Sequence, residues 1–105
     1  MKKLTIIAAT ALFMSAQATA QSRTITLEHM IGCKSKTVYD QLQSYVSDGD
    51  ETAFNHSYAM NVLQGQCTLF EKGGSVFIAD TTWSRVKIRR EGETTSYWTM
   101  MQAVL

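Results

Sequence analysis

Residues 66–98 constrain the fold most strongly, because they predict several short β-strands in close succession. Apolar and polar residues alternate along this segment, which is the pattern of strands with one buried face. Gly73-Gly74 and Gly92 fall between the alternating runs, where turns are needed. The expected strands are 67–70, 75–80, 83–90 and 94–101. Together they predict a small antiparallel β-meander over about residues 66–101.

Two helices are expected before this segment. Val38, Leu42 and Tyr45 share one face of a helix over about 35–46, and Ser35 is suited to cap its start. A second helix is expected over about 50–64, where apolar residues recur at the same spacing. Its apolar face contains Phe54, Tyr58, Val62 and Leu63. The short connection predicts an antiparallel helical hairpin over about 35–64.

Cys33 and Cys67 are the two cysteines of the chain, and they flank the predicted hairpin. In an oxidising compartment, two cysteines in so small a domain are expected to pair. A redox pair or a metal site is the alternative, but there is no C-x-x-C motif, and neither His29 nor His56 has zinc-like spacing to the cysteines. We therefore predict one structural disulfide, Cys33–Cys67, and no metal.

The N-terminus has the three parts of a secretory signal peptide over residues 1–20. Lys2 and Lys3 precede an apolar run over 4–14, and Ala18-Thr19-Ala20 is a small-x-small cleavage site. Cleavage after Ala20 predicts a periplasmic or secreted chain without a stable membrane anchor. A buried helix or a retained anchor is the alternative. A lipid anchor at Cys33 is not expected, because polar residues separate it from the apolar run.

Removing the signal peptide also changes the charge of the chain. The whole sequence has a formal net charge of +1, and loss of the two N-terminal lysines leaves a charge of −1. A nearly neutral exported chain is a poor nucleic-acid ligand. Nucleic acid is therefore not an expected partner.

The predicted fold is a single α+β domain over residues 21–105. An N-terminal helical hairpin packs on a small antiparallel β-meander or barrel, and one disulfide joins the two layers. The strand residues expected to face the hairpin are Val76, Ile78, Val86 and Ile88. Residues 21–32 contribute either an edge strand or a loose arm.

Several residues of the meander match a known type of domain. They are Gly65-x-Cys67, Gly73-Gly74, Val76-x-Ile78, the run Trp83…Val86-x-Ile88-Arg89, Gly92 and Tyr97-Trp98. This stretch resembles a bacterial SH3-like domain. The layout of signal, helices, two cysteines and meander is similar to small exported proteins of enteric bacteria. The resemblance implies binding of peptides or cell-wall material. The acidic cluster and paired tyrosines of SH3 domains that bind proline-rich peptides are not evident.

The candidate binding residues lie on the third expected strand and beside it. Arg85, Lys87 and Arg89 alternate, so they share one side of the strand, and Trp83 and Tyr97 could add flat aromatic surface. Such a surface suits an acidic partner or an anionic glycan. The alternative, which the alternation alone favours, is an ordinary solvated strand face.

No grouping of residues indicates catalysis. The sequence lacks a Gly-x-Ser-x-Gly elbow, a phosphate-binding loop, a dinucleotide fingerprint and a zinc-protease motif. We therefore expect a protein that is not an enzyme and has no cofactor. The favoured function is non-catalytic periplasmic binding of a protein or a cell-envelope component. The alternatives are an inhibitor or immunity-type protein that uses the turn at 71–75, and, less favoured, a cell-wall hydrolase.

Overall fold

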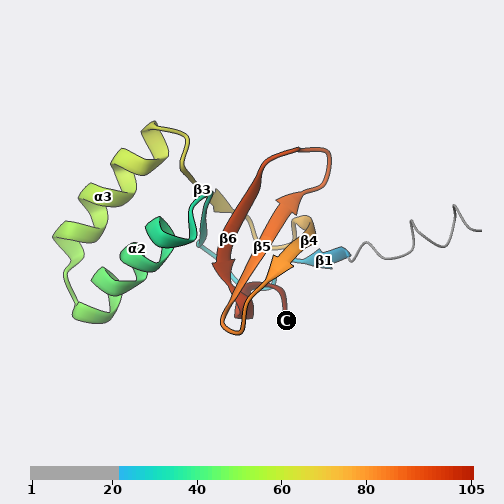
Figure 1. Cartoon of the computed structure of the whole chain (residues 1–105), viewed down its shortest axis with the longest axis horizontal. Helices are drawn as coiled ribbons and strands as arrows, with labels where there is room; N and C mark the ends of the chain where they lie inside the picture. Colours follow the sequence, from blue (N-terminus) through green and yellow to red (C-terminus); the bar gives the residue numbers. More distant parts are fainter. Residues whose placement is uncertain (1–21) are drawn as a thin grey trace, which may run out of the picture.

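A computed structural model of the chain describes residues 22–105 (Figure 1). The expected signal peptide and its cleavage site lie outside the described residues. The elements follow in the order β1 (Ser22–Thr24), β2 (Met30–Cys33), α2 (Lys36–Asp48), α3 (Glu51–Leu63), β3 (Cys67–Phe70), β4 (Ser75–Thr81), β5 (Arg85–Arg90), β6 (Ser96–Met100) and the 3₁₀ helix η1 (Met101–Val104). In this part of the chain, no helix has the length and apolar character needed to cross a bilayer.

The strands form one six-stranded antiparallel sheet in the order β1-β4-β5-β6-β2-β3. The predicted α+β class is confirmed, but the predicted N-terminal helical hairpin is wrong. The helices are inserted between β2 and β3 and therefore lie between strands. The reason is that residues 22–33 supply two strands of the sheet, and β2 lies inside it between β6 and β3. In Figure 1 the two helices lie to one side of the sheet.

Local signals at the helix ends are those expected from the sequence. The Ser35 side chain accepts a hydrogen bond from the Val38 N–H (3.3 Å), and Asp50 accepts one from the Ala53 N–H (3.0 Å). Gly49, between the helices, has φ 73°. Because this left-handed conformation suits glycine, the chain ends α2 there and starts α3 two residues later.

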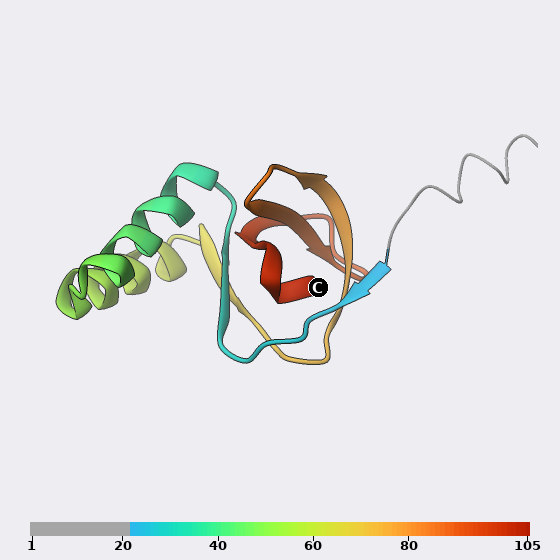
Figure 2. The ribbon, with the colours of Figure 1, turned by 90° about the horizontal axis from the view of Figure 1, so that it is seen from below.

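The main core lies inside the curl of the sheet and not beneath the helices. Val76, Val86 and Ile88 are buried there, with Ile78 packed against them. The prediction that these four residues pack on the helical hairpin is wrong. Their buried neighbours are Ile25, Met30, Phe70, Ala103 and Val104. The sheet curls far enough for its other strands and η1 to cover this face, and Figure 2 shows η1 inside the curl.

Backbone hydrogen bonds hold the curl closed near Ile25. The Ile25 N–H donates to the Gly74 carbonyl (2.9 Å), and the Gly73 N–H donates to the Ile25 carbonyl (2.8 Å). The Thr26 N–H donates to the Ala103 carbonyl (2.9 Å), which ties η1 to the segment after β1. These bonds join segments that are far apart in the sequence. The hydrogen bonds between paired strands alone would not connect these segments.

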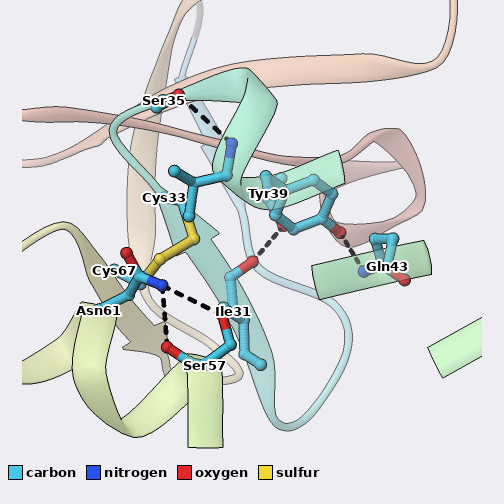
Figure 3. Close-up of a disulfide and its surroundings, with 10 residues drawn as sticks. Ile31, Cys33, Ser35, Tyr39, Gln43, Ser57, Asn61 and Cys67 are labelled. Carbon is cyan, nitrogen blue, oxygen red and sulfur yellow. Dashed lines mark hydrogen bonds between the residues drawn. A yellow bond between two sulfur atoms is a disulfide. The ribbon is translucent and has the colours of Figure 1, made fainter. Parts of the chain in front are cut away.

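A second, smaller core joins the helices to the sheet around the disulfide. Cys33 and Cys67 are bonded, as predicted, and they are directly opposite each other in the β2–β3 pair. Tyr39 and Leu42 are buried beside them, and half-buried apolar side chains from β2, β6 and both helices surround this cluster. In Figure 3 the disulfide lies between the two helices, with Tyr39 on one side and Asn61 on the other. The disulfide therefore closes the base of the helical insertion.

Candidate binding face on strand β5

Strand β5 alternates between a buried and an outer face, as the sequence predicted. Val86 and Ile88 are buried in the main core, whereas Arg85, Lys87 and Arg89 lie on the opposite, outer side and are half-buried. Charged side chains are costly to bury, so the alternation fixes which face of β5 enters the core. The three predicted basic residues are therefore brought together on one surface.

Each of these cations lies over an aromatic ring from a different element. The Arg85 guanidinium is 5.1 Å from the centre of the Tyr39 ring of α2, and the Lys87 ammonium is 5.7 Å from the Trp98 ring of β6. The Arg89 guanidinium is 5.0 Å from the Phe77 ring of β4. These distances are within the range of cation–π attraction. We call these six residues the basic–aromatic face.

Arg85 has a structural role within this face. Its Nε donates to the Asp40 carboxylate (2.9 Å), which also accepts from the Lys36 ammonium (2.8 Å). Burial raises the pKa of Asp40, but the hydrogen bonds and charges of Lys36 and Arg85 outweigh it and hold the pKa below its ordinary value. This pair joins α2 to β5. Arg85 is therefore the least available of the three cations for a partner.

Lys87 and Arg89 are less constrained. A β-bulge between Ile78 and Asp80 shifts the β4–β5 register and places Asp80 opposite Lys87. Among the described residues, however, no carboxylate lies within ion-pairing distance of either Lys87 or Arg89. The Arg89 guanidinium instead donates to the Glu93 carbonyl (2.8 Å). Neither Lys87 nor Arg89 is therefore held in an ion pair within the described residues.

Trp83 lies in the turn between β4 and β5 and is 95% exposed. The sequence predicted it as the first residue of a strand. The strand begins two residues later, because Thr82 closes the turn on both sides. The Thr82 N–H donates to the Arg85 carbonyl (2.8 Å), and the Thr82 hydroxyl accepts from the Arg85 N–H (3.1 Å). A turn that these hydrogen bonds fix thus exposes an indole that contacts almost nothing in the described chain.

Tyr97 does not belong to the outer face. It is opposite the buried Ile88 in the β5–β6 register, it packs against the main core, and its ring meets the Phe70 ring edge-on at 5.7 Å. Trp98, the next residue, takes the outer position. Strand alternation contained the signal for this assignment, because Tyr97 and Trp98 had to point to opposite faces.

One other feature of the surface is an open cavity away from this face. This cavity of about 450 Å³ lies beside β3 and β4, and its lining includes Leu69, Phe70, Val76 and Arg90. Within residues 22–105, no group of three or more His, Cys, Asp or Glu side chains is arranged to hold a metal ion. The basic–aromatic face offers positive charge to a partner, together with the half-buried rings of Phe77 and Trp98, whereas the Tyr39 ring is buried.

Searches against protein-family models, curated proteins and solved structures found no match to this chain.

Proposed function

We propose that this chain is an exported, non-catalytic binding protein that recognises an acidic protein or an anionic cell-envelope component. Trp83 and the basic–aromatic face form the contact surface. The expected signal peptide supports a periplasmic site of action, and the resemblance to SH3-like domains supports a binding role.

The observation that carries the proposal is the exposure of Trp83 on a held turn. An indole that is 95% exposed gains almost no stabilisation from burial on folding, whereas tryptophan is among the residues that dominate binding energy in interfaces. Because Thr82 fixes the backbone of the turn, little backbone freedom is lost when a partner covers the ring. Trp83 is therefore suited to act as the apolar anchor of a contact.

Lys87 and Arg89 determine the chemistry of the partner. Their charges are not paired with carboxylates of the described chain, and the aromatic rings beneath them keep water from one side. A carboxylate or a phosphate that approaches this face would meet two cations already held in place. Acidic peptides, acidic protein surfaces and anionic glycans share this chemistry.

The test compares the wild-type protein with Trp83→Ala and with the double variant Lys87→Glu/Arg89→Glu. Each protein is immobilised and exposed to periplasmic extract and, separately, to purified peptidoglycan sacculi. Each variant should capture at least about tenfold less material than the wild type. A tenfold loss of affinity corresponds to roughly 1.4 kcal/mol of binding free energy. Arg85 is left unchanged, because its substitution would also break the ion pair that joins β5 to α2.

Lys72→Glu is the matched control and also examines the inhibitor alternative. Lys72 is exposed in the turn at 71–75, which hydrogen bonds to Ile25 hold in place. A held, exposed turn is a suitable inhibitory loop, so this alternative also has a structural basis. If Lys72→Glu no longer captures the material and Trp83→Ala still does, the contact lies in the turn at 71–75. Release of soluble fragments from the sacculi would instead favour the hydrolase alternative.

A further inference from the structure

Strand β3 is the last strand of the sheet, and in the described part of the chain no strand pairs with its free edge. The Lys34 N–H donates to the Gln66 carbonyl (2.8 Å), next to the disulfide-bonded pair. Backbone groups alternate in direction along an antiparallel strand, so the N–H and C=O of Leu69 point away from β2. The free edge of β3 therefore carries backbone groups that could bond to another strand.

Arg90 reaches this edge from the end of β5. Its guanidinium donates to the Leu69 carbonyl (2.7 Å) and to the Thr68 hydroxyl (3.2 Å). The same group lies 4.3 Å from the centre of the Phe70 ring and 5.9 Å from that of the Tyr97 ring. Because β3 and β5 are not neighbours in the sheet, this side chain provides a link between them that strand pairing does not.

The charge of Arg90 is directed inward at the edge of the sheet. Arg90 is on the same side of β5 as the buried Ile88, and its side chain is only 29% exposed. The Glu93 carboxylate, 3.6 Å from the guanidinium, helps to hold it. The open cavity of about 450 Å³ beside β3 leaves room at this edge. Inward-pointing charges are one of the features by which sheets avoid pairing with other chains.

We infer that Arg90 blocks the free edge of β3, and that without its guanidinium this edge would pair with β3 of a second copy of the chain. Two antiparallel copies of β3, related by a two-fold axis, could exchange N–H···O=C bonds between their Leu69 residues. In the wild-type protein the Leu69 carbonyl already has a partner, and two approaching edges would bring two positive charges together. This inference does not depend on the proposed function, because Arg90 is not part of the basic–aromatic face.

The test is sedimentation equilibrium of the wild type, Arg90→Met and Arg90→Gln from about 10 µM to about 1 mM. The full chain is expressed, and the monomer mass of the form that the cell yields is fixed by mass spectrometry in denaturant. Methionine keeps a long side chain over the Phe70 ring and glutamine keeps a polar one, but neither carries the charge. The wild type should keep the monomer mass, whereas both variants should rise towards at least twice that mass. Circular dichroism checks that each protein is folded.

Arg89→Met is the matched control. It removes the same charge from the adjacent position, where the guanidinium also lies over an aromatic ring, that of Phe77, but on the other side of β5. This variant should stay monomeric. A folded Arg90 variant that keeps the monomer mass over the whole range would overturn the inference and leave Arg90 a purely structural role. Association of Arg89→Met or of the wild type to the same extent would overturn it as well.

Two further measurements locate the contact at β3. Adding Leu69→Pro to Arg90→Met should restore the monomer, because proline removes an N–H that points away from β2 and leaves the β2–β3 bonds in place. In Arg90→Met alone, the Leu69 amide should exchange with solvent more slowly at about 1 mM than at about 10 µM, because pairing protects it. Association that persists in a folded double variant, or exchange that does not change with concentration, would place the contact elsewhere and contradict the inference.

Discussion

Reducing the Cys33–Cys67 disulfide should lower the free energy of unfolding by about 4 kcal/mol. The two cysteines are 34 residues apart in sequence, and the chain-entropy model assigns a loop of this length roughly 13 cal/mol/K, or about 4 kcal/mol at 25 °C. Domains are typically stable by about 5–15 kcal/mol. This one bond therefore accounts for between about a quarter and about four fifths of the stability that is typical of a domain.

The structure indicates that the effect acts on the unfolded chain. Cys33 and Cys67 are both buried and are register partners in adjacent strands, so the reduced thiols remain side by side among the same neighbours. Reduction leaves their volume almost unchanged, whereas substitution by alanine would add a cavity. Comparing the oxidised and reduced wild-type protein is therefore the cleanest measurement.

The assay is urea unfolding followed by far-ultraviolet circular dichroism, with and without a phosphine reductant. With a slope of about 1 kcal/mol/M, the midpoint should fall by roughly 3–4 M on reduction. A Cys33→Ala/Cys67→Ala variant should show no change when the reductant is added, which controls for effects of the reagent. A shift of less than about 1 M would refute the entropic reasoning, because the helical insertion would then be closed in the unfolded chain without the bond.

Two further predictions concern single side chains. Gly32→Ala should lower Tm by roughly 5–15 °C in a thermal melt, because its Cβ would lie 2.5 Å from a ring carbon of the buried Phe70 and overpack the core; an unchanged Tm would contradict this. Asp40→Asn should cost about 0.5–1 kcal/mol at pH 7, an amount limited by solvent screening because the carboxylate is 40% exposed. Since the pKa of Asp40 is lowered by folding, its contribution is present above the ordinary value of 3.8 and is lost as the pH falls below it. Melts of wild type and variant should therefore differ at pH 7 and converge near about pH 2, whereas a gap that persists in acid would exclude the ion pair as its cause.

The helices could be predicted from the sequence because their signals are local. Ser35 and Asp50 cap the two helices as expected, and the predicted ends agree with the observed ones to within two residues. Capping depends on residues three apart, so no knowledge of the sheet is required. The cysteine pairing was likewise predictable, because the chain has only two cysteines.

The place of the helices in the fold depended on β2, which the alternation rule does not detect. Met30, Gly32 and Cys33 are all buried, because this strand is covered by the main core on one side and by the helices on the other. A strand buried on both faces does not alternate. When β2 is not recognised in the sequence, the helices are expected to precede the sheet. In the structure they lie between two of its strands, β2 and β3.

Only the cations of the basic–aromatic face could be predicted from the sequence, and not their pairing with aromatic rings. Alternation brought Arg85, Lys87 and Arg89 to one side of β5, but the rings beneath them come from α2, β4 and β6. Which ring lies under which cation depends on strand register and, for Tyr39, on how α2 meets the sheet. These are long-range relations that a single sequence does not specify.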